Sequence, residues 1–328
     1  METHKKINLL ILGGTKFIGK TLIDAMDQKY FRIDVLSKKK YTNKKINRFY
    51  HTELKNFEKF AIKKKYDYIF DFISKDTGVL KKILLKMNYN KYIFISSVWL
   101  AKINRNIKLD RSIKKVVLNK QLPNITKKYL LNKYKVENFL VNMSNKKNKK
   151  LYILRLPVIL GNNDATERLD FYTKRALDGY GQIILKNKRI DLNLLYVEDL
   201  CAAIIKLIKN KQWVTNKFLE ALNFSSISYE NFLKIINIQL GLKKKNFFYL
   251  NQQLVKKKYR SYFNYNPFLN EVPLNITKNN IFKLTNYKPQ SFKRYVKNIK
   301  LKVNFCKLLD NTRINEINFL SKLKKQKC

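Results

Sequence analysis

Short apolar runs alternate with amphipathic stretches through the first half of the chain. Several runs, such as YIFISS, are nearly continuous, which is typical of strands buried on both faces of a parallel sheet. These runs predict strands at residues 7–12, 31–36, 66–73, 91–97 and 151–156. Helical periodicity predicts helices at residues 20–27, 78–87 and 126–143. This alternation predicts an α/β fold built on a doubly wound parallel Rossmann sheet.

The pattern loosens after residue 156. A strand-like KFLEALNF follows a helical stretch at residues 201–210, and Ser228 caps a helix that stops at Gly241. Residues 243–273 show little periodicity and predict an irregular or mobile lobe, whereas the tail after Asn304 predicts an amphipathic helix. We expect a Rossmann domain at residues 1–160. Residues 161–328 are expected to form mainly a smaller C-terminal substrate-binding lobe, interwoven with the sheet.

The first predicted strand leads directly into a glycine-rich turn, GGTKFIG. Three of the chain's eight glycines lie in these seven residues, which argues against an ordinary strand-to-helix turn. A turn this tight needs residues without a Cβ atom, and the helix behind it offers free N–H groups to a pyrophosphate. The expected dinucleotide-binding residues are Gly13, Gly14, Thr15, Lys16, Phe17, Ile18 and Gly19.

This turn resembles the GGTGFIG fingerprint of the extended short-chain dehydrogenases/reductases, the NAD-dependent epimerase/dehydratase family. It is closer still to an atypical branch with GGTRFIG, which includes bacterial epimerase-like or reductase-like proteins and chloroplast stem-loop RNA-binding proteins. Lys16 occupies the position of the missing glycine. The resemblance covers most of residues 7–300 and implies an NAD(P)-binding Rossmann domain.

The end of the second strand bears on the choice of cofactor. An acidic residue there binds the ribose 2′-OH of NAD, whereas a basic residue accommodates the 2′-phosphate of NADP. This chain has Ser37 and Lys38 at that point, and Lys16 could reach a phosphate on the adenosine side. We therefore expect NADP or NAD, with NADP slightly favoured.

The family's chemistry uses a Tyr-x-x-x-Lys pair on one face of a helix. Positions i and i+4 are neighbours on a helix, so the ammonium favours the phenolate of a tyrosine whose ordinary pKa is about 10. About three such pairs are expected by chance in a chain with 20 tyrosines and this much lysine, and Tyr41–Lys45 is one. Tyr129 and Lys133 are favoured because they begin an amphipathic helix after the YIFISS strand. The alternative is an exposed tyrosine on a surface helix.

Other matches extend the resemblance. Ser97 best matches the family's catalytic serine and Ser96 is the runner-up, although both could simply end a strand. Glu137 follows Lys133 as in the family. The RLP segment, with Arg155 and Pro157, is expected beside the nicotinamide end of the cofactor. The residues expected to shape the substrate mouth are Asp164, Thr166 and Arg168.

The resemblance implies an NAD(P)-dependent oxidoreductase or epimerase acting on a nucleotide-sugar-like substrate. Hydride would pass between the substrate and the nicotinamide, with Tyr129 as acid/base, Lys133 holding the tyrosine and the ribose, and Ser97 polarising the substrate oxygen. A dehydratase is least favoured, because Val98 and Trp99 stand where such enzymes usually carry an Asp-Glu pair. Asp199, in the YVEDL segment, is expected to be a structural charge at a helix start.

The net charge of +47 raises a second hypothesis, a Rossmann-fold RNA-binding protein resembling the chloroplast stem-loop-binding proteins. Only 11 of the 70 basic residues are arginine, and the lysines are spread along the whole chain. Lys, Asn, Ile, Tyr and Phe share A/T-rich codons, so genome composition accounts for much of the charge. Nonspecific nucleic-acid affinity is expected in either case. A complete serine, tyrosine and lysine set argues against a protein that only binds.

The remaining composition narrows the class of protein. Three widely separated cysteines predict no disulfide framework or zinc site and suit a reducing compartment. Two histidines and scattered carboxylates predict no metal. The apolar runs fall short of the roughly 20 residues of a membrane span, and no signal-peptide pattern is present. We expect a cytoplasmic protein without membrane contact, with a homodimer left open.

Overall fold

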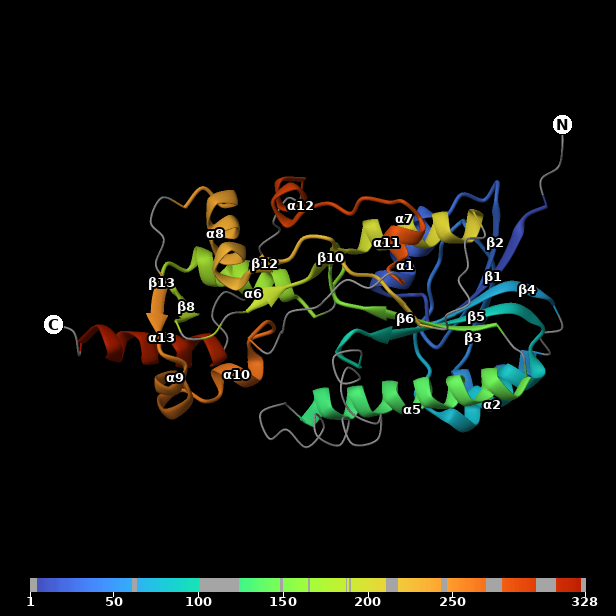
Figure 1. The fold of residues 1–328 in the computed structure, drawn as a ribbon, viewed down its shortest axis with the longest axis horizontal. Coiled ribbons are helices and arrows are strands. Elements are labelled where there is room, and N and C mark those ends of the chain that lie inside the picture. Colours follow the sequence, from blue (N-terminus) through green and yellow to red (C-terminus); the bar gives the residue numbers. More distant parts are fainter. Residues whose placement is uncertain are drawn as a thin grey trace.

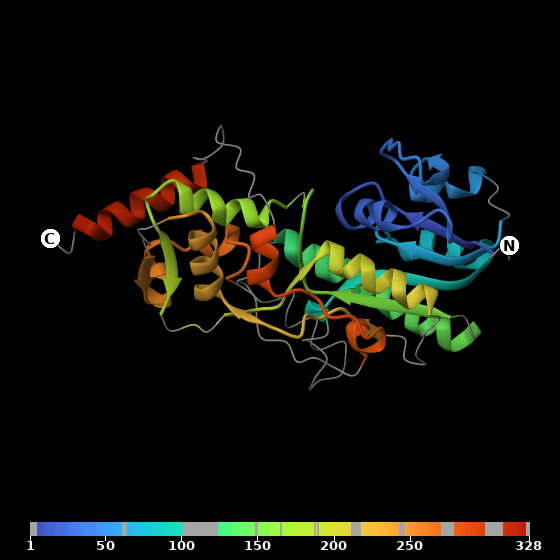
Figure 2. The same cartoon turned by 90° about the horizontal axis from the view of Figure 1, so that it is seen from above.

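The computed structural model describes residues 5–60, 64–100, 124–147, 150–164, 166–186, 188, 190–210, 218–242, 247–269, 279–298 and 311–325. These residues form two lobes arranged end to end. The chain begins in the sheet-containing lobe and ends at the far side of the other lobe (Figures 1 and 2).

A seven-stranded sheet forms the first lobe. Its strand order is β11-β6-β5-β4-β1-β2-β3, and all neighbouring pairs are parallel. The strands are β1 (Ile7–Leu12), β2 (Phe31–Ser37), β3 (Ile46–His51), β4 (Tyr66–Asp71), β5 (Tyr89–Ser97), β6 (Leu151–Leu156) and β11 (Phe218–Glu220). The order reverses between β1 and β4, which is the switch point where doubly wound sheets bind ligands beyond the carboxyl ends of their strands. The predicted α/β Rossmann fold is confirmed.

Helices cover both faces of this sheet (Figure 1). One face carries α1 (Phe17–Ala25), α7 (Val197–Lys209) and the short α11 (Ile281–Leu284). The other carries α2 (Thr77–Lys86) and α5 (Asn124–Lys147), with the 3-10 helix η1 (Leu54–Phe60) beside α2. None of the helices in the described ranges is long and apolar enough to cross a membrane.

The two covered faces explain the continuous apolar run of β1. Leu9 and Ile11 belong to the core that includes α1 and α7, while Leu10 and Leu12 belong to the core that includes α2 and α5. Successive residues of a strand point to opposite faces, so a strand with two buried faces needs apolar residues at every position. All four of these side chains are fully buried.

The second lobe is built around an aromatic core in which Tyr172, Phe232 and Phe268 pack with ring centroids 5.0–5.2 Å apart. Its helices are α6 (Arg168–Leu177), α8 (Tyr229–Gln239), α9 (Gln252–Lys258), α10 (Tyr262–Tyr265), α12 (Phe292–Asn298) and α13 (Asn311–Lys325). The short strands outside the main sheet are β7 (Val158–Leu160), β8 (Gln182–Leu185), β9 (Asp191–Leu192), β10 (Leu194–Tyr196), β12 (Ile227–Ser228) and β13 (Phe247–Leu250). Although α7 and β11 follow β10 in the chain, they return to the first lobe. The boundary at residue 160 stays a prediction.

The predicted tail helix is confirmed as α13, which is held on the lobe by buried charges. Arg313 binds Asp178 at 2.6 Å and Glu316 at 2.8 Å, and Glu316 also binds Arg175 at 2.9 Å. The four side chains are at most 5% exposed. Removing Glu316 would leave Arg175 buried without a carboxylate partner, and removing Arg313 would leave Asp178 buried without its cation.

One strand was missed and one expectation was wrong. Strand β3 was not predicted, because its sequence INRFYH is polar at a sheet edge, where Asn47 and Arg48 remain exposed. Residues 243–273, expected to be irregular or mobile, include β13, α9 and α10. Strand β13 forms by pairing with the distant β8, which periodicity does not register, and Asn251 caps α9 through a 2.8 Å bond from Gln253 N–H.

Candidate dinucleotide and catalytic site

The glycine turn joins β1 to α1 at the carboxyl edge of the sheet. Gly13 has a φ of +84°, a left-handed conformation that favours glycine, and an added Cβ there would lie 2.1 Å from Ile73 Cγ2. A Cβ on Gly19 would lie 2.4 Å from the Cα of Gly14. Helix α1 therefore packs directly against the turn. Its first N–H groups, which have no intrahelical acceptor, begin beside the end of β1.

Lys16 takes the place of the family's middle glycine without backbone strain. Its φ of −131° and ψ of 158° are extended values that any residue adopts, and its side chain is exposed. The positive φ falls instead on Phe17, at 27°, which packs with Ile18 against the core beneath α1. The glycine-to-lysine change is thus compatible with the turn and adds a cation to its surface.

The end of β2 adjoins this turn through Ser37. The Ser37 hydroxyl lies 3.1 Å from Thr15 Oγ1 and accepts a 3.2 Å hydrogen bond from Lys39 N–H. Ser37 itself is buried, whereas Lys38 is exposed. The residues present fit a dinucleotide: a cradle without Cβ atoms, a helix N-terminus, and exposed ammonium groups rather than a carboxylate at the end of β2. Through its contacts with Thr15 and Lys39, Ser37 connects the end of β2 to the glycine turn.

Helix α5 brings the candidate catalytic pair to the end of β5. Lys133 Nζ donates a 2.6 Å hydrogen bond to the Ile95 carbonyl, two residues before Ser97, and lies 4.3 Å from the centroid of the Phe94 ring. The same Nζ is 6.0 Å from the centroid of Tyr129, whose side chain is 47% exposed. Lys133 therefore stands between the accessible tyrosine and the strand that ends in Ser97.

The surroundings of the pair act on its proton equilibria. Desolvation lowers the pKa of Lys133 to about 8, against the opposing charges of Asp71 and Glu137. Desolvation also raises the pKa of Tyr129, and the Glu137 charge adds to the rise while the Arg168 cation opposes it. At neutral pH Lys133 is mainly protonated and the tyrosine carries its proton, so the hydroxyl starts as a donor.

Asp71 is a site residue that sequence reasoning missed. It ends β4, is fully buried, and accepts hydrogen bonds from the N–H groups of Ile73 at 3.0 Å and Ser74 at 2.8 Å and from the Tyr92 hydroxyl. Its register partner on β5 is Phe94, the residue whose ring lies under Lys133. A carboxylate closing a buried strand, as in YDYIFD, was the available signal.

Arg155, expected beside the nicotinamide end, is engaged in a buried ion pair, and its position relative to a cofactor stays a prediction. Its guanidinium binds Glu137 through two bonds of 2.6 and 3.1 Å, and both side chains are below 8% exposed. This pair ties α5, which carries Tyr129 and Lys133, to β6. Pro157, half-buried, follows Leu156, the register partner of Ser97, so this residue does lie at the edge where β5 ends.

The residues expected at the substrate mouth form a cluster at the start of α6. The Asp164 carboxylate accepts bonds from the Thr166 hydroxyl at 2.5 Å and from the Arg168 guanidinium at 3.3 Å. The effect of Arg168 on the pKa of Tyr129 places this cation in the electrostatic surroundings of the tyrosine.

Asp199, in the first turn of α7, binds the segment that follows α11. It accepts hydrogen bonds from the Tyr287 hydroxyl at 2.9 Å and from Gln290 N–H at 2.8 Å.

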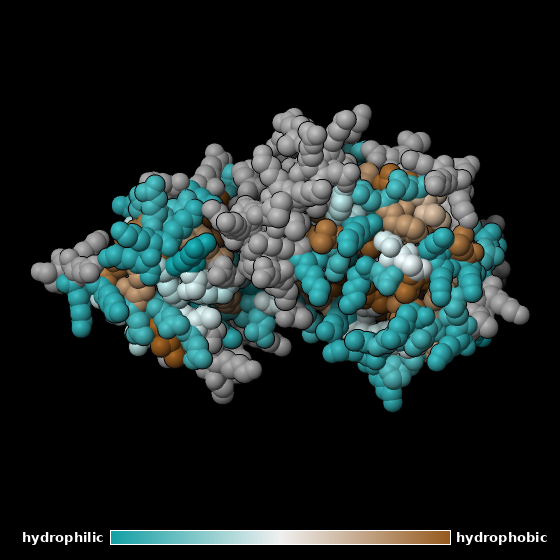
Figure 3. Space-filling view, turned by 90° about the horizontal axis from the view of Figure 1, so that it is seen from below, coloured by the Kyte–Doolittle hydropathy of each residue, from teal (hydrophilic) through white to brown (hydrophobic). Residues whose placement is uncertain are grey.

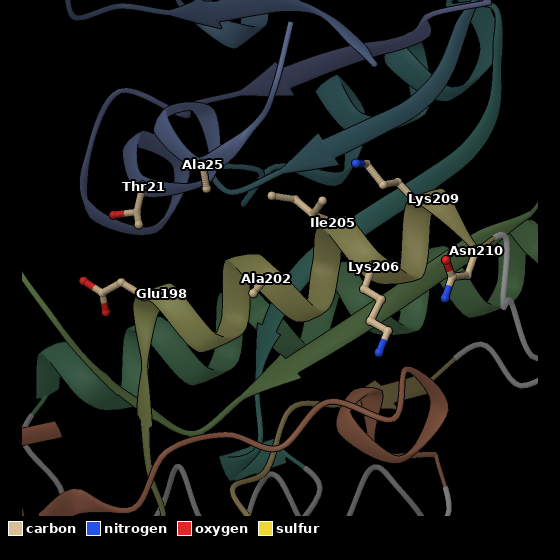
Figure 4. A pocket seen from close by; sticks show the side chains of 8 residues that line it. All are labelled: Thr21, Ala25, Glu198, Ala202, Ile205, Lys206, Lys209 and Asn210. Carbon is tan, nitrogen blue, oxygen red and sulfur yellow. The ribbon is translucent and has the colours of Figure 1, made fainter. Parts of the chain in front are cut away.

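A separate groove of about 380 Å³ lies between α1 and α7 (Figure 4). Thr21 and Ala25 line one side, and Ala202 and Ile205 face them from α7. Its lining includes no residue of the glycine turn and none of the three catalytic candidates. This groove is therefore distinct from the candidate site.

No protein-family model and no curated protein sequence matches this chain. Solved structures do match it. A UDP-glucose 4-epimerase from Thermotoga maritima with UDP-glucose is 16% identical, covers 89% of this chain and 96% of its own, and gives a TM-score of 0.61. A dTDP-glucose 4,6-dehydratase from Bacillus anthracis with NAD is 17% identical, and the match covers 89% of this chain and 94% of the dehydratase with a TM-score of 0.62. A UDP-glucuronic acid 4-epimerase from Bacillus cereus with UDP-glucuronic acid and NAD is 14% identical, and the match covers 97% of this chain and 100% of the epimerase with a TM-score of 0.58.

The chain has the fold of nucleotide-sugar epimerases and dehydratases. This similarity extends through the C-terminal lobe, since the matches span nearly the whole of each chain. At these identities the likeness establishes the fold, and a shared fold does not fix the reaction.

Proposed function

We propose that the protein is an NAD(P)-dependent epimerase or reductase that acts on a nucleotide-sugar-like substrate. The observation that carries the proposal is the position of Lys133 between Tyr129 and the β5 segment ending in Ser97. The similar solved structures include proteins with bound NAD and UDP-sugars, which supports this class of ligand. A chance Tyr-x-x-x-Lys match has no reason to lie at the carboxyl end of the central strand β5.

The roles that we propose for these residues are supported by their positions. A bound nicotinamide dinucleotide would supply hydride transfer. Tyr129 exchanges a proton with the substrate oxygen, and the Lys133 ammonium stabilises its phenolate. Ser97 donates a hydrogen bond to the same oxygen. Its hydroxyl accepts a 3.3 Å bond from Trp99 N–H, which leaves the O–H available as a donor.

The cofactor end and the substrate end are assigned separately. The turn of residues 13–19 receives the pyrophosphate, and exposed Lys16 and Lys38 favour a 2′-phosphate, so NADP is preferred over NAD. Arg168, held by Asp164, receives the anionic part of the substrate. The epimerase and reductase reactions use the same protein groups, and the proposal covers both.

A thermal-shift titration with NADPH, NADP⁺, NADH and NAD⁺ at moderate salt tests the cofactor assignment. Saturable stabilisation in the micromolar range, stronger for the phosphorylated forms, is expected. A preference for NAD⁺ would overturn the role of the two lysines and leave the enzyme proposal standing. No shift with any of the four, together with stabilisation by RNA, would favour the RNA-binding alternative.

Turnover is tested with a panel of UDP- and dTDP-hexoses followed by proton NMR. Tyr129→Phe is expected to abolish conversion while leaving dinucleotide binding within twofold. Tyr41→Phe is the matched control, since Tyr41 belongs to the second Tyr-x-x-x-Lys match but bonds Asp24 on the surface and should remain active. Equal activity of wild type and Tyr129→Phe would contradict the proposed chemistry.

A further inference from the structure

The groove between α1 and α7 leaves an apolar strip of α7 partly exposed (Figure 4). The α7 residues that line it include Glu198, Ala202, Ile205 and Lys209, at steps of four, three and four residues. Such steps keep side chains on one face of a helix and are typical of a seam between two helices. Ala202 and Ile205, at the centre of this seam, are partly exposed. The seam therefore suits a second helix, with charged residues at the ends of an apolar centre.

Glu198 lies at one end of the seam without a cation of its own. Its side chain is exposed at the rim of the groove, yet desolvation raises the pKa of the carboxyl group, and the charge of Asp199 adds to the rise. Within the described ranges no cation offsets this rise. An acidic residue without a cation is unexpected in a chain with 70 basic and 23 acidic residues. A cation from a second molecule would complete this end of the seam.

Lys206 provides a cation at the matching distance on the other side of Ala202. Glu198 and Lys206 are each four residues from Ala202, which at about 1.5 Å per residue places them about 6 Å along the helix in opposite directions. Lys206 Nζ donates to the Asn286 carbonyl at 3.3 Å, and an ammonium has two further N–H donors. Two α7 helices laid antiparallel across Ala202 therefore bring each Glu198 beside Lys206 of the other copy.

We propose that two copies of this chain associate through the groove, about a two-fold axis at Ala202. The interface is isologous, because Glu198 of each copy pairs with Lys206 of the other. Alanine at the crossing point allows the two helix axes to approach within about 8–10 Å, and Thr21 and Ala25 on the α1 side are also small. This interface is independent of the proposed enzymatic function, because the groove includes none of the catalytic candidates.

Sedimentation equilibrium of the full chain at moderate salt tests this proposal. At physiological ionic strength, salt screens the repulsion between two chains of net charge +47 over a distance of about 8 Å. A reversible dimer is expected, with a dissociation constant of about 10–100 μM because the interface is small. A chain that remains monomeric at about 1 mM would overturn the proposal.

Charge reversal separates a specific pair from the effect of overall charge. Glu198→Lys raises the net charge from +47 to +49, whereas Lys206→Glu lowers it to +45. Each variant should weaken dimerisation about tenfold, since each turns both attractions into repulsions. The double variant Glu198→Lys with Lys206→Glu should recover the wild-type affinity. An equimolar mixture of the two single variants should form a heterodimer, because both pairs are then again of opposite charge.

The matched control is Leu85→Glu on α2. Helix α2 covers the opposite face of the sheet, where hydrophobic residues are scattered among hydrophilic ones in the described part of the chain (Figure 3). Leu85 is 46% exposed, and its substitution should leave dimerisation within twofold of wild type. Thermal unfolding checks that every variant remains folded.

Three results would overturn the proposal. Loss of the dimer in Leu85→Glu, with dimerisation unchanged in the Glu198 and Lys206 variants, would assign the interface to the α2 face. A tighter dimer of Lys206→Glu would show that affinity follows the overall charge. A mixture of the single variants that forms no heterodimer would exclude the two-fold pairing of Glu198 with Lys206.

Discussion

Lys133→Met is expected to stabilise the protein at neutral pH while weakening the proposed dinucleotide site. The ammonium is partly buried, rests against the Phe94 ring and donates to the Ile95 carbonyl. Desolvation lowers its pKa to about 8, against an ordinary value of 10.5. Methionine is about as long as lysine, is apolar, and brings no charge into this position.

The magnitude follows from the two pKa values. At about 1.4 kcal/mol per pKa unit, a fall from 10.5 to about 8 corresponds to about 3 kcal/mol of cost to the folded protein. The folded pKa is the lower one, so this cost is fully present below about pH 8. It is relieved as the pH rises toward 10.5, where the unfolded chain also loses its proton. Leaving the Ile95 carbonyl without its donor costs about 1–2 kcal/mol, so the expected net gain at neutral pH is about 1–2 kcal/mol.

Urea denaturation of both proteins at neutral pH and at about pH 10 measures this effect. The substitution lowers the net charge only from +47 to +46, so general charge repulsion is nearly the same in both proteins and their difference reports mainly the surroundings of Lys133. The advantage of the variant should shrink at the higher pH, and dinucleotide affinity should fall at least tenfold. A wild type that is the more stable protein at neutral pH, or a difference that does not change with pH, would refute the reasoning.

Three further single substitutions test buried contacts at the candidate site and on α13. Glu137→Ala should lower the free energy of unfolding by about 3–5 kcal/mol in the same urea assay, because it leaves Arg155 buried and unpaired. The double variant Glu137→Leu with Arg155→Met should recover most of that stability. Equal losses in the single and the double variant would contradict a buried ion pair. Gly19→Ala should lower the free energy of unfolding by about 1–3 kcal/mol, since the added Cβ would lie 2.4 Å from the backbone of Gly14. Calorimetry should show dinucleotide binding about tenfold weaker. Unchanged affinity would count against the turn as the binding site. Glu316→Ala should release α13, seen as rapid proteolytic cleavage within that helix, while unchanged protection would show that the apolar contacts alone hold it.

The sheet could be predicted because its strands carry their own signal. In β1 the neighbours Leu9 and Leu10 face different cores, so burial on both faces is visible as an unbroken apolar run. Strand β3 lacks this signal because it is an edge strand with exposed Asn47 and Arg48. Pairings between distant segments, such as β8 with β13, leave no local pattern.

The candidate site could be predicted only in part, for a related reason. The glycine turn can be recognised in the sequence because local geometry requires glycine at two of its positions. Gly13 has a positive φ, and Gly19 approaches the backbone closely. The Tyr129–Lys133 and Tyr41–Lys45 pairs look alike in sequence. The structure separates them, because Tyr41–Lys45 lies outside any helix and the Tyr41 hydroxyl donates to the Asp24 carboxylate on the surface.

What distinguishes Lys133 from most lysines in the described part of the chain is strong desolvation next to a tyrosine, and that depends on residues far from it in the sequence. Phe94 and Ile95 come from β5, while Asp71, whose charge opposes the fall in the pKa of Lys133, comes from β4. Exposed lysines such as Lys38 share the residue type but not these surroundings. Because the net charge counts all lysines equally, it says little about chemistry in this chain. Burial beside an accessible tyrosine, as at Lys133, is therefore the stronger argument for an enzyme.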